Sequence, residues 1–152
     1  MDRIAINIKN RLSLRPPQAE SLNILAELAD KLTLNKAPRL DKEGIQGWLN
    51  ESLNKVKTSY PTCTDFERNF PSICFALATG VGKTRLMGAF VSYLYLSKGI
   101  KNFFVLAPNL TIYNKLIEDF SNSTHPKYVF QGIGEFVHNQ PVIITGDNYT
   151  NA

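Results

Sequence analysis

Cysteine is scarce in this sequence, with only Cys63 and Cys74 among 152 residues. The two are not spaced as metal ligands and no histidine cluster accompanies them, which argues against a cysteine-bound metal. We therefore expect ordinary reduced thiols in a reducing compartment. Cys74, which lies within an apolar run, is expected in the core.

Long hydrophobic runs and a dominant charge are missing as well. No stretch approaches the ~20 apolar residues that cross a bilayer, and the N-terminus lacks the apolar region of a signal peptide. These two absences predict a cytoplasmic protein with no membrane association. The formal charge is only +4, which suits contact with phosphate backbones without requiring it.

The first half of the chain predicts one short strand and two helices. With 43% apolar residues, the chain can bury a single core, so one domain is expected. Residues 4–8 alternate apolar and polar side chains, as in an edge strand. Leucines at helical spacing predict a helix over 17–34, and Asp41 is expected to cap a second amphipathic helix that continues to Val56. Residues 59–71 are expected to form a loop.

The second half predicts alternating strands and helices. Residues 73–78 form a continuous apolar run, which is typical of a strand covered on both faces in a parallel sheet. A helix should follow and end near Gly99, and Asn109 should cap another. Further strands are expected at 103–107, 128–130 and 142–145. This order predicts an α/β fold with right-handed crossovers.

A glycine-rich loop over 78–84 joins the first of these strands to its helix. Gly80 and Gly82 allow the backbone to approach a phosphate closely. Lys83 can reach the β- and γ-phosphates of a nucleoside triphosphate, and Thr84 can offer its hydroxyl to magnesium. The alternative is a tight turn with a solvated Lys83, which the flanking strand and helix disfavour.

The loop reads Ala-Thr-Gly-Val-Gly-Lys-Thr, with Leu77 where the longer Gly-x-x-x-x-Gly-Lys-Thr pattern has its first glycine. In this form it resembles the first motif of superfamily 2 helicases of the DEAD/DEAH type. The most similar branch is the motor (Res) subunit of type III restriction enzymes. The resemblance spans roughly 14–149 and implies a P-loop NTPase (RecA-like) three-layer parallel sheet, incomplete here and preceded by two N-terminal helices.

The same resemblance implies ATP and Mg²⁺ as cofactors. It makes Lys83 the catalytic residue, because its ammonium would stabilise charge on the transferred phosphoryl group, and it makes Thr84 the metal ligand. The implied ATP-binding residues are Arg15, Gln18, Thr79, Gly80, Val81, Gly82, Lys83 and Thr84.

Two further segments carry the resemblance. Arg15-Pro16-Pro17-Gln18 is similar to an upstream segment whose glutamine reads the adenine edge, although Pro17 stands where an aromatic is common. The alternative for Gln18 is an exposed polar residue in a first helical turn. Residues 104–109 resemble a motif that contacts a nucleic-acid backbone, which assigns DNA binding to Pro108 and Asn109. An ordinary N-cap explains Asn109 equally well.

An acidic magnesium-binding motif is missing from the sequence. Asp147 is the best substitute, but Gly146-Asp147-Asn148 favours a turn. In the family this motif and the second motor lobe come later in the chain. We therefore expect residues 1–152 to be the N-terminal part of a helicase ATP-binding domain. In this division, 1–70 carry the adenine-reading segment and 71–152 the P-loop core.

The predicted function is the ATP-binding portion of an ATP-dependent DNA helicase or translocase that does not hydrolyse ATP by itself. The resemblance implies DNA and a modification (methyltransferase) subunit as partners of the full-length protein. Two alternatives stay open: a non-hydrolysing nucleotide-binding module, and a P-loop enzyme outside the helicases. His125 and His138 are expected to be isolated and solvated, and Trp48 is expected to pack rather than stack on a base.

Overall fold

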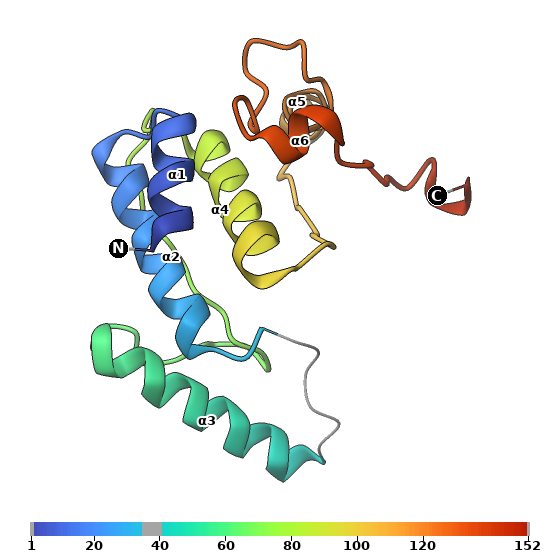
Figure 1. Cartoon of the computed structure of the whole chain (residues 1–152). Helices are drawn as coiled ribbons and strands as arrows, with labels where there is room; N and C mark the ends of the chain where they lie inside the picture. The colour runs from blue at the N-terminus through green and yellow to red at the C-terminus, as the bar shows by residue number, and fades with distance from the viewer. Residues whose placement is uncertain (1, 35–40, 152) are drawn as a thin grey trace.

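The computed structural model describes residues 2–34 and 41–151, and these residues form helices joined by turns and extended segments (Figure 1). The structure is 55% helical. The elements are α1 Arg3–Arg11, α2 Pro16–Lys31, α3 Lys42–Ser59, α4 Lys83–Lys98, α5 Leu110–Ser121, α6 Gly134–His138 and a short 3-10 helix, η1, over Tyr149–Asn151.

The predicted parallel sheet is wrong, because no strand occurs within 2–34 or 41–151. Residues 73–78, 103–107 and 142–145 have no strand assignment and no neighbouring strand within the described ranges. A strand is stable only when its backbone bonds to an adjacent one, and an apolar run does not specify that neighbour. Phe104 is 88% exposed and Val142 81% exposed, so these apolar runs are not buried on both faces.

The segment 4–8, predicted as a strand, lies instead in α1. Ala5 and Ile8 are buried on one side of this helix, and Leu12 extends the same stripe beyond its end. This spacing is helical rather than alternating. The side chain of Asp2 caps the helix by accepting a hydrogen bond from the Ile4 backbone N–H at 2.9 Å.

Residues 128–130, also predicted as a strand, lie in a run of turns.

The four helices predicted from spacing and caps are confirmed. The Asp41 carboxylate accepts from the Gly44 N–H at 2.8 Å at the start of α3. Asn109 caps α5 in the same way, accepting from the Ile112 N–H at 3.0 Å. Helix α4 ends at Gly99, whose φ of 66° is left-handed. Local side-chain chemistry therefore set these helix ends.

The main core lies where α1, α2 and α4 pack together (Figure 1). The turns after α5 and helix α6 pack on the other side of α4, adding the buried residues Phe120, Tyr128, Val129, Phe130, Ile133 and Phe136 to the same cluster. Gly88 of α4 allows this contact, because a Cβ there would lie 2.5 Å from the Val129 carbonyl oxygen. Two segments about 40 residues apart are thereby held together.

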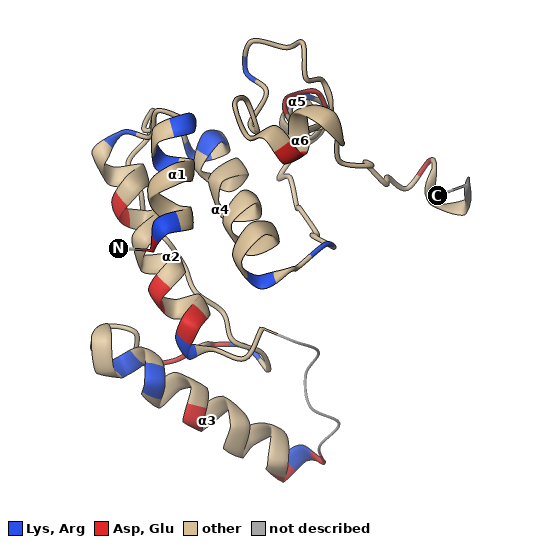
Figure 2. Ribbon diagram, in the orientation of Figure 1, with Lys and Arg blue, Asp and Glu red and all other residues tan. Residues whose placement is uncertain are grey.

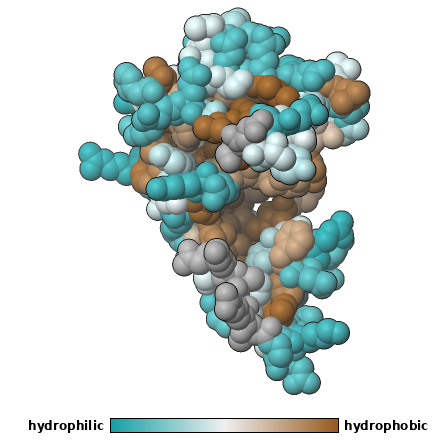
Figure 3. Space-filling model, turned by 90° about the vertical axis from the view of Figure 1, so that its right-hand side faces the viewer, coloured by the Kyte–Doolittle hydropathy of each residue, from teal (hydrophilic) through white to brown (hydrophobic). Residues whose placement is uncertain are grey.

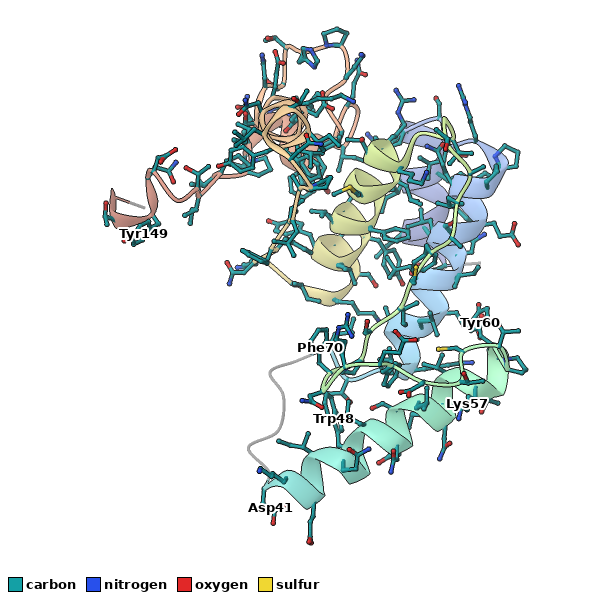
Figure 4. All side chains as sticks on the ribbon, turned by 180° about the vertical axis from the view of Figure 1, so that it is seen from behind. Asp41, Trp48, Lys57, Tyr60, Phe70 and Tyr149 are labelled. Atoms are coloured by element: carbon teal, nitrogen blue, oxygen red, sulfur yellow. The ribbon has the colours of Figure 1, made fainter. Side chains whose placement is uncertain are left out.

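Helix α3 packs against α2 around a second, smaller core. Trp48 is half-buried against this cluster, as predicted, and Figure 4 shows it on α3. Cys63 also contacts this cluster, whereas Cys74 is exposed, so its predicted burial is wrong.

Hydrophobic side chains remain open on part of the surface. Figure 3 shows brown, hydrophobic residues lining a hollow on one face of the molecule. A cavity of about 570 Å³ between α2, α3 and the loop 60–77 is partly apolar. Among the described residues, no helix combines the length and the apolar character needed to span a membrane.

Tyr93 ties the N-terminus to α4. Its ring is fully buried and its hydroxyl donates to Asp2 Oδ2 at 2.5 Å. Burial first, and this hydrogen bond second, raise the pKa of Tyr93 from 10.0 to about 12. The fold therefore favours the neutral phenol. The stability that the fold gains from the neutral Tyr93 phenol is complete below pH 10, and it is lost as the pH rises toward 12.

We therefore expect the melting temperature, followed by circular dichroism, to fall as the pH rises from about 10 to about 12. Burial also raises the pKa of Tyr60 and Tyr128, so part of the fall should persist in Tyr93→Phe. The control is Tyr149→Phe, because Tyr149 is 66% exposed. A fall in Tyr93→Phe as steep as that in Tyr149→Phe would contradict this account.

Candidate nucleotide-binding site

The glycine loop has the backbone conformation that its sequence predicts. Gly80 and Gly82 have φ values of 80° and 86°, in the left-handed region that side chains disfavour. Helix α4 begins immediately afterwards at Lys83. The unpaired N–H groups of a first helical turn and the positive end of the helix dipole favour an anion at this point.

Gln18 connects this loop to the start of α2. It is 2% exposed, and its Nε2 donates to the Gly82 carbonyl at 2.8 Å while its Oε1 accepts from the Arg15 N–H at 2.8 Å. Gln18 is therefore not the exposed first-turn residue of the alternative interpretation. A carboxamide keeps a second N–H and a second lone pair after these two bonds. A Cβ at Gly82 would lie 2.7 Å from Gln18 Nε2, so another residue at this position would displace the Gln18 carboxamide.

Lys83 bends back across the loop. Its ammonium donates to the Ala78 carbonyl at 2.9 Å, and its side chain is exposed. Arg15 approaches the same loop, with one guanidinium nitrogen 3.5 Å from the Gly80 carbonyl. Two cations thus lie at carbonyl groups of the loop, where a bound polyphosphate would offer them stronger, charge-assisted partners.

A cavity of about 310 Å³ lies beside the loop. Six predicted ATP-binding residues line it, namely Arg15, Gln18, Gly80, Val81, Gly82 and Thr84, whereas Thr79 and Lys83 are not among its lining residues. Sequence reasoning missed the other five: Arg85, Lys115, Asp119, Lys127 and Val129.

The lining of this cavity is strongly cationic. Arg15, Arg85, Lys115 and Lys127 contribute positive charge, and Asp119 contributes the one negative side chain among the described lining residues. Figure 2 shows basic residues (blue) gathered where α1 ends and where α2 and α4 begin. A concave site with this excess of positive charge attracts polyanions.

The missed residues come from α5 and the turns behind it. Lys115 and Asp119 are one helical turn apart, with Lys115 Nζ 3.8 Å from Asp119 Oδ2. In the sequence this i,i+4 spacing is that of an ordinary ion pair on a helix surface, so it carried no distinctive signal for a site. The prediction of an isolated His125 is wrong, because its Nδ1 lies 3.4 Å from Asp119 Oδ1.

The remaining predicted residues do not line this cavity. Pro108 and Asn109 are exposed at the start of α5, where Asn109 serves as the N-cap. Asp147 lies in a turn, its backbone N–H donating to Thr145 Oγ1 at 3.3 Å. DNA binding by Pro108 and Asn109 stays a prediction, and the turn interpretation of Asp147 is confirmed.

The donor set suits a magnesium ion that arrives with a triphosphate. Thr84 offers a hydroxyl at the cavity, and magnesium usually takes most of its ligands from water and from substrate phosphates. Within 2–34 and 41–151 there is no group of three His, Cys, Asp or Glu side chains that could hold a metal ion. The assignment of Thr84 as the residue that would contact the metal stays a prediction.

A glycine loop at a helix N-terminus beside a cationic cavity is an arrangement that favours phosphate anions. A family profile described as "Type III restriction enzyme, res subunit" matches residues 11–151. The chain belongs to this family, as its motifs predicted.

One curated relative is the "Probable type III restriction-modification enzyme HindVIP Res subunit" of Haemophilus influenzae. It is 36% identical over 64 residues, which make up 41% of this chain and 12% of that protein. The chain thus matches only a small part of this relative's length. No solved structure shows significant similarity to the chain.

Proposed function

We propose that this chain is the ATP-binding segment of a type III restriction enzyme motor. The observation that carries the proposal is the cavity in which Gln18, the glycine loop and four cationic side chains converge. This arrangement matches the parts of a nucleoside triphosphate, since phosphates need N–H donors and cations while a base edge needs a group that both donates and accepts.

Each predicted residue then has a role. The backbone at Gly80 and Gly82 and the N-terminus of α4 bind the β- and γ-phosphates. Lys83 exchanges the Ala78 carbonyl for a phosphate oxygen and, in the complete enzyme, stabilises charge on the transferred phosphoryl group. Thr84 contacts a magnesium ion, which when bound neutralises phosphate charge. Gln18 uses its remaining N–H and lone pair to select adenine.

The wider assignment extends to the whole protein. We propose that the full-length motor is a cytoplasmic, ATP-dependent DNA helicase or translocase that acts with a modification subunit. The exposed Pro108 and Asn109 are the candidate contacts to the DNA backbone. These partners are implied by the family, and the cationic cavity supports the ATP part of the proposal.

The 152-residue chain should bind ATP without releasing phosphate. Hydrolysis needs an acidic group that polarises water and an arginine from a second lobe. The carboxylate that lines this cavity, Asp119, lies beside Lys115 and His125. We therefore do not assign it the role of the acidic group that hydrolysis needs. Calorimetry should detect ATP binding, and a phosphate-release assay should give the same background with and without duplex DNA.

Two results would contradict this account. Absence of ATP binding by the folded chain would overturn the nucleotide site. DNA-stimulated phosphate release would show that the chain contains a complete ATPase. The Lys83→Ala variant is the control for contaminating activity, because any genuine turnover by the chain should disappear in it.

A further inference from the structure

We propose that Asp119 is a ribose-binding residue of this cavity, with its free carboxylate oxygen accepting a hydrogen bond from the 2′- or 3′-hydroxyl of the nucleotide. The inference rests on the proposed function and adds a contact from α5, far in sequence from the glycine loop. This contact would hold the nucleoside rather than the phosphates, so it can be tested with nucleotides that differ only in their ribose hydroxyls.

Asp119 combines burial with an unsatisfied atom. Its side chain is 2% exposed, and among the described residues Oδ1 is a buried oxygen with no hydrogen-bond partner. The residue also lines the cavity beside the glycine loop. A buried carboxylate oxygen without a donor is energetically costly, so a ligand that brings a donor is favoured there.

The neighbours of Asp119 do not satisfy Oδ1. His125 Nδ1 lies 3.4 Å away, but this nitrogen accepts the Lys127 backbone N–H at 3.3 Å. A ring nitrogen that accepts a hydrogen bond carries no proton, so Nδ1 does not donate to Oδ1 in this arrangement. Lys115 Nζ lies 3.8 Å from the other oxygen, Oδ2.

The chemistry of the cavity decides which part of the nucleotide meets Asp119. Phosphate oxygens are acceptors and would be repelled by a carboxylate, whereas Lys115 and Lys127 on the same wall attract them. The carboxamide of Gln18 is the better match for a base edge. The ribose is bonded directly to the α-phosphate, so its hydroxyls are the donors nearest to groups that these lysines hold.

A divalent cation is a poorer match for Asp119 than a hydroxyl. The Lys115 ammonium is already close to the carboxylate, and a second cation at the same group would meet electrostatic repulsion. The experiment is therefore performed in metal-free buffer with EDTA, where a ribose contact persists and a metal-mediated contact does not.

The test compares ATP with 2′,3′-dideoxyATP by calorimetry on the 152-residue chain. The unchanged chain should bind ATP about tenfold more tightly than the dideoxy nucleotide, because one hydrogen bond to a charged group is worth ~1.4 kcal/mol or more. Asp119→Asn keeps an acceptor oxygen but loses the charge, so it should weaken ATP binding about threefold while leaving the affinity for dideoxyATP unchanged or slightly higher. If Asp119 acted only through its charge, Asp119→Asn should instead raise the affinity for ATP, because it removes a carboxylate that repels the phosphates.

Asp30→Asn is the matched control, because it removes one negative charge from an exposed pair with Lys98 outside the cavity. It should leave the ratio of ATP to dideoxyATP affinity unchanged. Equal affinities of the unchanged chain for the two nucleotides would overturn the inference while leaving the proposed function standing, even if Asp119→Asn does not fold. Failure of the folded, unchanged chain to bind ATP after magnesium is restored to the buffer would overturn both.

Discussion

Calorimetric titration of the Lys83→Ala variant with ATP should show an affinity at least ~100-fold below that of the unchanged chain, a loss of ~2.8 kcal/mol or more. The ammonium of Lys83 bonds to the Ala78 carbonyl at 2.9 Å, so it is held at the loop. A phosphate oxygen is a stronger, charge-assisted partner. Alanine removes both the charge and the donor.

The matched control is Lys55→Ala, which removes one cation from α3 at an exposed pair with Glu51. It should leave ATP affinity within about twofold, because such surface pairs contribute little and a distant charge is screened by salt. Circular dichroism should show that both variants keep the same helical content. Unchanged ATP affinity in a folded Lys83→Ala variant would remove the glycine loop from the binding site.

Replacing Gly88 with alanine should lower the free energy of unfolding by about 2 kcal/mol, even though alanine is the better helix former by about 1 kcal/mol. The new methyl group would lie 2.5 Å from the Val129 carbonyl oxygen and 2.6 Å from the Val129 Cβ. Relief of this clash requires a backbone shift where the turns pack on α4. Val129 lines the cavity, so the same shift should also weaken ATP binding.

Gly47→Ala is the control, since Gly47 also lies within a helix but an added Cβ would contact nothing within 4 Å. Without a clash, only helix propensity acts, and stability should rise by about 0.5–1 kcal/mol. Urea unfolding measures both changes. If Gly88→Ala raised stability as Gly47→Ala is expected to do, the close packing of α4 against Val129 would be refuted.

The helices were predictable because their signals are local. The Asp41 and Asn109 caps and Gly99 at the end of α4 all act within a few residues of their own positions. Helix α1, which was predicted as a strand, has an equally local cap at Asp2. Its isoleucines at 4, 6 and 8 satisfy alternation as well as helical spacing, and so short a segment does not distinguish the two patterns.

The sheet was not predictable because strand pairing is not local. Apolar residues at 103–107 and 142–145 indicate a preference for burial, yet Leu106 is 78% exposed and Ile144 60% exposed. An isolated extended segment gains none of the cross-strand hydrogen bonds that the prediction assumed. The apolar composition of these segments is evident from the sequence, but it does not specify which other segment they would pair with.

The candidate site divides in the same way. Residues near the loop in sequence, such as Gly80, Gly82 and Thr84, were identified by motif, and Gln18 by its resemblance to an adenine-reading segment. The other wall depends on the turns after α5, which bring Asp119 and Lys127 to the cavity. No periodicity or motif in the sequence indicates that these turns fold back against α4, so Asp119 and Lys127 were found only from the structure.

The central claim, that ATP binds at the glycine loop, is tested most directly by an NMR titration of the chain labelled with ¹⁵N-glycine. The sequence contains nine glycines, so each amide can be assigned and followed separately. The account predicts that the Gly80 and Gly82 amide signals shift most as ATP is added, while Gly47 on α3 stays in place. ATP binding that leaves the Gly80 and Gly82 signals unmoved would contradict it.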